Sequence, residues 1–544
     1  MPLSSRALAR SLELAAVEAA TLAGFLNDLD GWDGSDCDTG ANARLTLEAM
    51  RDAVARLEEG APFAQALEEA IAAGVVHGQG HIGVILAQTL AAWSKGLEGA
   101  RAIAPVTVRR MLKAPIVDDL SRCDLSPSIS AALSAGSNAL DELGDTLPDE
   151  GYVVSWYSLA VQSGLIEAAG EGPEAIDPGA SVLALLFACF DAAVGGDQSV
   201  LESFARMLSD LAERNGASPR PHSPSPGRDF AVDVVWQGTA SDAGALVDSL
   251  SRVGARFSSV GVLDPFGVGL WRLHVDTSAP LAARPRSGRL IRFAVADART
   301  DEELGVDELA DEGISHRGVR LLERRPLRRV ERARVIACTH APGILEDLAR
   351  TGAVVLLDPS PEDAAGILAL AAASATGVGL FIPCDSTTAA LGAAIAKRAE
   401  GEPDPLSLES DSSAPARLLV AGTRDELAAL AVAQATGGLF VPQPGGSAAA
   451  PAMERILAEA ERAVLASHTT RAIENEDPVL VAGLFADLDI EPTRAWRLLV
   501  SRGHGPELVA LVRQMAVGGN PWSPELEVLM GGQPGPSLLQ RIEA

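Results

Sequence analysis

The sequence predicts a multidomain protein in which an all-α helical barrel or bundle comes first, followed by a small α/β middle domain and an α/β C-terminal domain. The chain has 544 residues, more than one hydrophobic core usually organises. Apolar residues recur with helical spacing as far as about Glu213, a Pro/Ser-rich stretch follows, and short apolar runs then alternate with Ala-rich segments. The expected limits are residues 1–214, a linker at 215–228, a middle domain at 229–330 and a C-terminal domain at 331–544.

The helical domain begins with an amphipathic helix whose apolar positions are three, four or seven residues apart. These positions are Leu8, Leu12, Ala15, Leu22, Leu26 and Leu29. Gly31 ends this helix, and a second helix begins at Thr39 or Gly40. Asp36 and Asp38 are therefore expected just ahead of a helix N-terminus.

A domain boundary is expected at 215–228, reading N-G-A-S-P-R-P-H-S-P-S-P-G-R, because such a Pro/Ser-rich stretch can bury almost nothing. Beyond it, apolar runs at 230–236 and 269–275 predict strands, and the pattern at 243–253 predicts a helix. Together these elements indicate a small α/β unit.

The C-terminal domain shows the alternation of strands and helices that is typical of a parallel sheet. Its expected strands lie at 335–338, 354–357, 380–383, 418–420 and 439–442. Segment 375–383 is nearly repeated at 435–442, which predicts two βα units of similar design.

Composition excludes several classes of protein. With 73 acidic and 44 basic residues the net charge is −29, which argues against a nucleic-acid or anionic-membrane partner. Glu13 and Glu18 interrupt the first apolar helix, so no signal peptide is indicated. The long uncharged run at 364–384 is expected to be a buried helix followed by a strand, and no integral membrane association is predicted. The five cysteines form no C-x-x-C pair, so reduced thiols and a cytoplasmic location are expected.

The most acidic short segment, 30–42, reads D-G-W-D-G-S-D-C-D-T-G-A-N. Closely spaced carboxylates repel one another unless a cation holds them, and hard oxygen ligands suit magnesium. The helix that follows offers backbone N–H donors to an anion. Two interpretations remain open at this point: a site for a metal-bound polyphosphate, or an Asp/Gly-rich surface turn with a helix cap.

Two further segments repeat this design of a loop that opens an apolar helix. One is 77–83, reading H-G-Q-G-H-I-G, and the other is 177–181, reading D-P-G-A-S. Glycine-rich loops of this kind let main-chain donors approach phosphate closely. The repeated design favours the site for a metal-bound polyphosphate over the surface turn.

These motifs resemble the ATP-binding domain of dihydroxyacetone kinases, the DhaL domain, and especially the larger fatty-acid kinases built on it. Segment 36–42 is similar to the family's Asp-x-Asp-[Thr/His]-Gly-x-Asn signature, and 80–86 resembles its Gly-Asn-Ser-Gly-Val-Ile-Leu loop. Near the end of the chain, 526–534 is similar to the closing Gly-Gly-Gln-Pro strand of the fatty-acid kinases. The resemblance therefore spans the whole chain and implies a DhaL-like helical domain.

The resemblance implies particular roles for the motif residues. Asp36 and Asp38 would be catalytic magnesium ligands, and Asp30 falls where the dihydroxyacetone enzymes have their first ligand aspartate. The residues that would border the nucleotide are Thr39, Gly40, Asn42, Gly80, His81, Ile82, Gly83, Asp177, Pro178 and Gly179. One or two Mg²⁺ ions and ATP are the cofactors implied.

Three departures from the family pattern bear on activity. His81 and Ile82 replace Asn and Ser, so a hydroxyl that could bond phosphate is missing and main-chain donors remain. Cys37 replaces the glycine between the two aspartates, and the family's Glu-Gly-Thr stretch is not found near 113–119. These changes are compatible with nucleotide binding and leave catalysis as an open question.

The function that the resemblance implies is transfer of the γ-phosphoryl group to a small acceptor, foremost the carboxylate of a fatty acid presented by a binding partner. Two alternatives stay open: a dihydroxyacetone (glycerone) kinase, and a nucleotide-binding regulatory or scaffold protein with weakened catalysis. Proteins of this type often act as dimers, so a homodimer is also an option, although no segment indicates an interface.

The resemblance also bears on other metals and on the C-terminal domain. In the family, two histidines and an upstream cysteine hold zinc in the middle domain, but here Asp276 replaces the second histidine and Ala231 the cysteine. We therefore expect no zinc, with His274 a packed or hydrogen-bonded strand residue. The family's C-terminal Gly-Gly-Gln-Thr-Met-Asn-Pro-Ser and Leu-Pro-Asn-Asn motifs are replaced at 357–361 and 382–385. His340, His468 and His504 show no ligand spacing and are expected to be surface or cap residues.

Overall fold

The computed structural model of the chain describes residues 3–29, 38–58, 60–100, 102–116, 125–144, 147–170, 176–214, 227–298, 309–326, 332–374, 376–401, 417–442, 446–488, 493–517 and 525–543. Most of the acidic segment, 30–37, and most of the expected linker, 215–226, lie outside these ranges.

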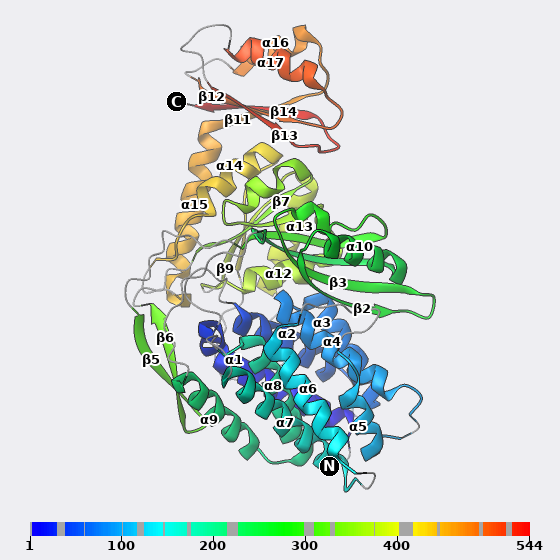
Figure 1. Cartoon of the computed structure of the whole chain (residues 1–544). Helices are drawn as coiled ribbons and strands as arrows, with labels where there is room; N and C mark the ends of the chain where they lie inside the picture. Colours follow the sequence, from blue (N-terminus) through cyan, green and yellow to red (C-terminus); the bar gives the residue numbers. More distant parts are fainter. Residues whose placement is uncertain are drawn as a thin grey trace.

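The described chain up to residue 214 is built from helices, which form the lower part of the molecule in Figure 1. Their bounds are α1 (Ser5–Leu29), α2 (Thr39–Ala55), α3 (Phe63–His77), α4 (Gly80–Leu97), α5 (Pro105–Lys113), α6 (Pro127–Glu142), α7 (Glu150–Gly170), α8 (Pro178–Gly195) and α9 (Ser199–Arg214). The prediction that a helical part precedes an α/β part is confirmed.

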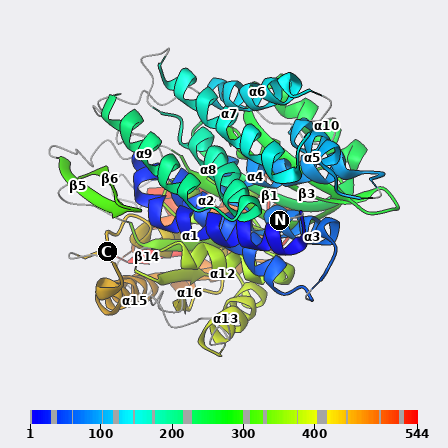
Figure 2. The same cartoon turned by 90° about the horizontal axis from the view of Figure 1, so that it is seen from below.

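The central helix of this part is α8, which contacts α1, α7 and α9 and lies among them in Figure 2. A helix that packs against other helices on every side carries apolar residues all round. Accordingly, α8 is the one helix in the described ranges that is long and apolar enough to cross a membrane, yet 83% of it is buried inside the molecule. Its hydrophobicity is explained by its place in the core.

An eight-stranded sheet lies above the helices, in the order β10-β9-β7-β8-β4-β1-β3-β2. Its strands are β1 (Phe230–Thr239), β2 (Arg256–Leu263), β3 (Val268–Thr277), β4 (Arg289–Asp297), β7 (Arg334–Thr339), β8 (Val354–Leu357), β9 (Val378–Ile382) and β10 (Arg417–Val420). Strands β1 to β4 pair antiparallel, whereas β7, β8, β9 and β10 pair parallel as the sequence predicts.

The two halves of the sheet join where β4 pairs with β8 through Ala294 and Leu356. The expected boundary between residues 330 and 331 therefore separates two parts of one sheet, and one hydrophobic core runs through both. The helices and 3₁₀ turns around this sheet are α10 (Ala240–Arg252), η1 (Pro280–Ala283), η2 (Pro342–Ile344), α11 (Leu345–Ala349), η3 (Pro361–Asp363), α12 (Ala364–Ala372), α13 (Ser386–Gly401), α14 (Glu426–Thr436), η4 (Gly446–Ala449) and α15 (Ala450–Ser467).

The run at 364–384 forms α12 and then β9, as expected. The prediction of a strand at 439–442 is wrong. There the chain makes only an isolated bridge between Phe440 and Arg332, besides the hydrogen bond from the backbone N–H of Ala333 to the carbonyl of Leu439. The near-repeat in sequence therefore does not produce two equal βα units.

Two smaller sheets complete the fold. Strands β5 (Leu309–His316) and β6 (Val319–Pro326) form a hairpin that lies beside α9 and α1. At the C-terminal end, β11 (His468–Ile473), β12 (Thr493–Val500), β13 (Glu525–Met530) and β14 (Ser537–Glu543) form a sheet in the order β11-β14-β12-β13. This sheet packs with α16 (Pro478–Leu488) and α17 (Pro506–Val517) around a core of its own.

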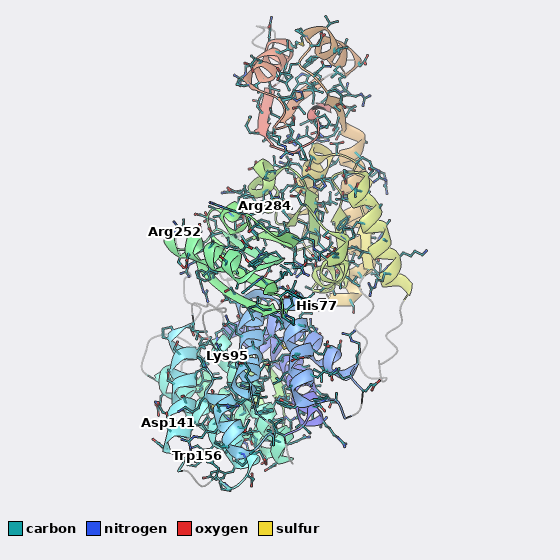
Figure 3. All side chains as sticks on the ribbon, turned by 90° about the vertical axis from the view of Figure 1, so that its right-hand side faces the viewer. His77, Lys95, Asp141, Trp156, Arg252 and Arg284 are labelled. Atoms are coloured by element: carbon teal, nitrogen blue, oxygen red, sulfur yellow. The ribbon has the colours of Figure 1, made fainter. Side chains whose placement is uncertain are left out.

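The large sheet meets the helical part through a polar face. Because side chains alternate along a strand, Arg272, His274 and Asp276 of β3 share one face, and His274 lies directly opposite Asp233 of β1. This face is turned toward α3 and α4, and His77 at the end of α3 lies where the two parts meet (Figure 3). The polar face of the sheet therefore lies next to α3 and α4, the helices on either side of the predicted loop at 77–83.

Candidate functional site

The first predicted motif opens α2. Asp38 is the residue before the helix, and its Oδ1 accepts a hydrogen bond of 2.7 Å from Nδ2 of Asn42. The backbone N–H of Ala41 donates to Oδ1 of Asn27 on α1 at 3.1 Å. Asp38, Thr39, Gly40 and Asn42 therefore gather at the positive end of a helix dipole, whereas Asp30 and Asp36 lie outside the described residues.

Gly40 sets how closely α2 crosses α1. A Cβ atom at this position would lie 2.3 Å from the carbonyl oxygen of Ala23, a distance no side chain tolerates. The glycine of the first motif thus has a packing role in addition to any contact with a ligand.

The second motif opens α4 and lies against the first. Gly80 has a positive φ of 59°, and a Cβ there would come within 2.5 Å of Nδ2 of Asn42. The backbone N–H of Gln79 donates to the hydroxyl of Thr46 at 3.0 Å, and that hydroxyl donates to the carbonyl of Asn42 at 2.7 Å. The two helix starts are therefore tied together, and glycine is required where they touch.

The third motif opens α8 and adjoins the second through Ile82. A Cβ on Gly179 would lie 4.0 Å from Cδ1 of Ile82. Oδ1 of Asp177 accepts the backbone N–H of Ala180 at 2.8 Å, and Pro178 occupies the first turn. Asp177 thus acts as the N-cap of a buried helix, which explains its presence without a nucleotide.

His81 points away from these helix starts and into the sheet. Its Nδ1 and Nε2 lie 2.7 Å from the hydroxyl of Ser258 and 3.1 Å from Oδ2 of Asp276, and its ring meets that of His274 edge-on at 4.4 Å. Burial and the neighbouring His274 lower the pKa of His81 to about 4, although Asp276 acts in the opposite direction. His81 is therefore neutral at neutral pH and joins the helical part to the sheet.

The ligand atoms of His81, His274 and Asp276 all lie within 4.8 Å of one another. The sequence did not foresee this group because His81 comes from the helical part and its partner Asp276 lies 195 residues further along. His274 also lies 3.1 Å from Asp233, as a hydrogen-bonded strand residue would. The expectation that no zinc binds here stays a prediction.

Arg334 at the start of β7 lies within electrostatic range of Asp38. Burial lowers the pKa of the Arg334 guanidinium, and the Asp38 carboxylate opposes that shift. Positive charge from the protein itself is thus present in the surroundings of the first motif.

No family model matches the chain, and no curated protein matches it.

Proposed function

We propose that this protein is an ATP- and Mg²⁺-dependent kinase of the DhaL type that transfers a γ-phosphoryl group to a small acceptor. The observation that carries the proposal is the contact between Gly80 and Asn42, which holds the starts of α2 and α4 together at a glycine with positive φ. Phosphoryl transfer requires chiefly that the nucleotide be held and its charge neutralised. Two adjoining helix N-termini suit that task, since both present backbone N–H groups to an anion.

The residues present fit a magnesium–nucleotide complex in part. Asp38 offers a carboxylate at a helix start, and Asp30 and Asp36 would supply the others from the segment outside the described residues. When bound, magnesium would neutralise phosphate charge. Asn42 orients the Asp38 carboxylate through its side-chain hydrogen bond, and the main chain of Gly80 to Gly83 would hold the phosphates.

The acceptor proposed is the carboxylate of a fatty acid presented by a separate binding protein, and it rests on the family resemblance alone. Dihydroxyacetone is the alternative acceptor. A cytoplasmic setting and a homodimer belong to the same proposal, and both come from composition and resemblance.

A different class of function has its own support. Ile82 provides no hydroxyl, His81 is engaged with Asp276, and Arg334 supplies positive charge near Asp38. These features favour a nucleotide-binding regulatory or scaffold protein with weakened catalysis.

Calorimetry of ATP binding with and without magnesium tests the site. We expect magnesium-dependent binding by the wild-type chain and a loss of at least about tenfold in affinity, about 1.4 kcal/mol, in Asp38→Asn and in Asp36→Ala. Asp197→Asn is the matched control, because Asp197 lies at the start of α9 and pairs only locally with Ser199 among the contacts described. Equal binding by all four proteins would contradict the assignment.

Turnover separates the acceptors. ATP consumption with oleate and a fatty-acid-binding protein is expected to exceed consumption with dihydroxyacetone. Activity confined to dihydroxyacetone would replace the fatty-acid proposal with its alternative. Tight magnesium-dependent ATP binding with no phosphorylated acceptor of either kind would favour the regulatory protein.

A further inference from the structure

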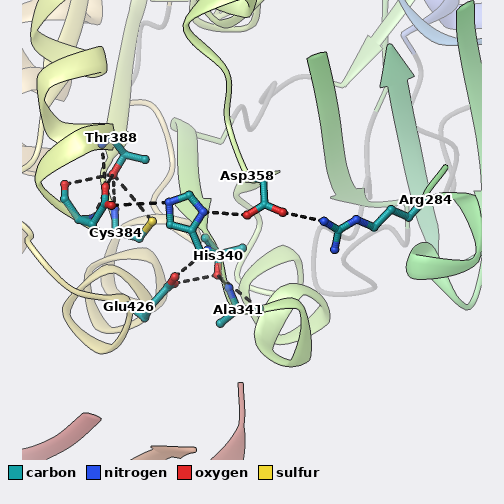
Figure 4. Close-up of polar contacts among 9 residues, drawn as sticks. Arg284, His340, Ala341, Asp358, Cys384, Thr388 and Glu426 are labelled. Atoms are coloured by element: carbon teal, nitrogen blue, oxygen red, sulfur yellow. Dashed lines mark hydrogen bonds and ion pairs between the residues drawn. The ribbon is translucent and has the colours of Figure 1, made fainter. Parts of the chain in front are cut away.

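A second group of ligand-type side chains lies far from the nucleotide loops, at the carboxyl ends of the parallel strands. His340 follows β7, Asp358 follows β8, and Cys384 and Asp385 come shortly after β9 (Figure 4). In open α/β sheets this edge is where ligands bind, because the loops after neighbouring strands meet there. The sequence predicts an ordinary surface or cap residue at His340 and gives no indication that these side chains lie beside it.

Three different donor types converge in this group. A ring nitrogen of His340, Sγ of Cys384 and a carboxylate oxygen of Asp385 all lie within 4.8 Å of one another. Nε2 of His340 is 3.7 Å from Oδ2 of Asp385, too far for a hydrogen bond. Nitrogen and oxygen ligands on one tetrahedral zinc ion would be roughly 3.3 Å apart, from their usual bond lengths. The spacing therefore suits an ion between the two atoms.

The other side of the His340 ring is held in the manner of a metal ligand. Nδ1 donates to Oδ1 of Asp358 at 2.8 Å, and Arg284 donates to Oδ2 of the same carboxylate at 2.8 Å (Figure 4). Metal-binding histidines usually donate their second ring N–H to a carboxylate, which fixes the ring and directs the free nitrogen at the ion. Here that arrangement leaves Nε2 directed toward Asp385.

The backbone at Asp358 adds an independent sign of a functional position. Its φ is +50°, a left-handed conformation that costs free energy for a residue other than glycine. That conformation lies at the residue whose carboxylate joins His340 to Arg284. The strained turn is thus coupled to the orientation of the histidine.

Asp385 and Cys384 are fixed through Thr388. Oδ1 of Asp385 accepts from the backbone N–H of Thr388 at 2.7 Å and from its hydroxyl at 2.8 Å, which leaves Oδ2 on the side of His340. The backbone N–H of Cys384 donates to the Thr388 hydroxyl at 3.0 Å. Both donors therefore stand on one rigid turn at the start of α13.

Glu426 supports the group from below. Its two carboxylate oxygens accept the backbone N–H of His340 at 2.6 Å and the hydroxyl of Thr339 at 2.7 Å. These bonds fix the end of β7, so Glu426 has a positioning role. Exposure differs across the group: the side chains of His340 and Asp385 are 30% and 39% exposed, whereas Cys384 is buried.

We propose that His340, Cys384 and Asp385 bind a zinc-class divalent ion, with the fourth position open to water or to an anionic ligand. Nitrogen and thiolate donors select zinc over magnesium. On binding, the Cys384 S–H bond breaks, its proton leaves to solvent and a sulfur–metal bond forms. This site is independent of the kinase proposal, and it differs from the His81 group in having a sulfur ligand.

Cobalt(II) is the probe, because a thiolate ligand gives a near-ultraviolet charge-transfer band that nitrogen and oxygen ligands do not. The full-length chain, stripped of metal, is expected to develop this band with one equivalent of cobalt and to lose it on addition of zinc. Cys384→Ala should abolish the band. Asp358→Asn should retain it with affinity reduced roughly 10- to 100-fold, as for other carboxylate partners of metal-binding histidines.

Three controls identify the source of the band. Cys189→Ala truncates another buried thiol, in α8, and should keep the band. Cys37→Ala and His274→Gln should also keep it, which excludes the acidic segment and the His81 group. Absence of a thiolate band in the wild-type chain, or its persistence in Cys384→Ala, would overturn the proposal, and the first of these outcomes does not depend on how any variant folds.

Discussion

Single residues decide how closely the two predicted nucleotide loops approach each other. Gly80 combines a positive φ with crowding by Asn42, whereas Gly99 has a positive φ of 71° and open space around it. We expect Gly80→Ala to destabilise the fold by about 2–4 kcal/mol and Gly99→Ala by about 1 kcal/mol, since only the first adds a steric clash to backbone strain. Chemical denaturation measures both. Equal losses would mean that Asn42 moves aside freely.

The salt bridges of Asp363 and Glu362 make a second matched pair at this scale. Arg292 donates to both oxygens of Asp363 in a buried pair, while Arg289 and Glu362 form an exposed one. Removing one member of a buried pair leaves a charge without compensation. Asp363→Asn should therefore cost about 3–5 kcal/mol of unfolding free energy, and Glu362→Gln about 0–1 kcal/mol. Similar costs for both would show that water reaches Arg292.

The sequence could identify residues whose signal is local and missed those whose partners are distant. Asp38, Asn42 and Gly80 belong to short motifs, and the structure places these motifs at helix starts as the sequence predicts. The bonds from His81 to Ser258 and Asp276 span 177 and 195 residues. Such a contact depends on how the sheet docks on the helices, which no local spacing encodes.

At the scale of elements, the β5–β6 hairpin is the clearest device that the sequence did not reveal. Its turn, Arg317-Gly318, has positive φ at both residues, the geometry of a type I′ hairpin turn. The side chain of Arg317 donates to Oε1 of Glu18 at 2.7 Å, and His316 bonds to Oε2. The hairpin is highly charged, so apolar periodicity gave no indication of it. It is attached to α1 by this contact and also lies beside α9.

Acid should release this hairpin. Burial opposes ionisation of Glu18, but His316 and Arg317 outweigh it and lower the pKa of that carboxyl below its ordinary value of 4.5. Its stabilising contribution is therefore complete above pH 4.5 and is lost as the pH falls through the lowered value. The protection of the β5 and β6 amides against hydrogen exchange, taken relative to the intrinsic exchange rate at each pH, should fall in that range, and Glu18→Gln should lower this protection already at pH 7. Unchanged exchange in the variant would mean that other contacts hold the hairpin.

The remaining elements show where periodicity suffices. Helices α1, α2, α4 and α8 and the parallel strands were predictable, because buried helices and buried strands have distinct apolar spacings. The prediction of a strand at 439–442 was wrong because a four-residue apolar run does not show whether a neighbouring strand is there to pair with. The chain there makes a single bridge to Arg332.

For the whole molecule, the important surface is the one where the helical part meets the polar face of the sheet. There Gln88 of α4 donates to the carbonyl of Ser259 at 2.6 Å, and Val260 joins the hydrophobic core of the helices. The first predicted boundary, after residue 214, follows a change in composition, whereas the continuity of the sheet across residue 330 could not be read from sequence because strand pairing is non-local. If the kinase proposal holds, His81 links the phosphate loop directly to this surface, and nucleotide binding and domain contact must influence each other reciprocally.

This surface should weaken in mild acid. Burial lowers the pKa of His77 to about 4, and the charges of Arg292 and Arg272 add to the effect. Burial also lowers the pKa of His81 to about 4. Both imidazoles are neutral in the folded protein but take up protons near pH 6.5 once separated or unfolded. Stability is thus complete above pH 6.5 and falls as the pH drops toward 4, by up to about 1.4 kcal/mol per pH unit for each histidine.

Other groups on the surface limit this effect and define its control. The pKa of His274 is raised because Asp233 outweighs the burial of the ring, so His274 changes the pH dependence of stability in the opposite direction. The pKa values of Asp233 and Asp276 are lowered, so these carboxylates affect stability only in more acidic solutions. We expect unfolding free energies measured at pH 7 and pH 5 to differ less in His81→Gln than in the wild-type chain. His504→Gln, between β12 and α17 of the C-terminal part, should leave the difference unchanged. If the unfolding free energy depended on pH equally in wild type and His81→Gln, His81 would have to remain hydrated in the folded protein. Another residue would then have to couple the loop to the sheet.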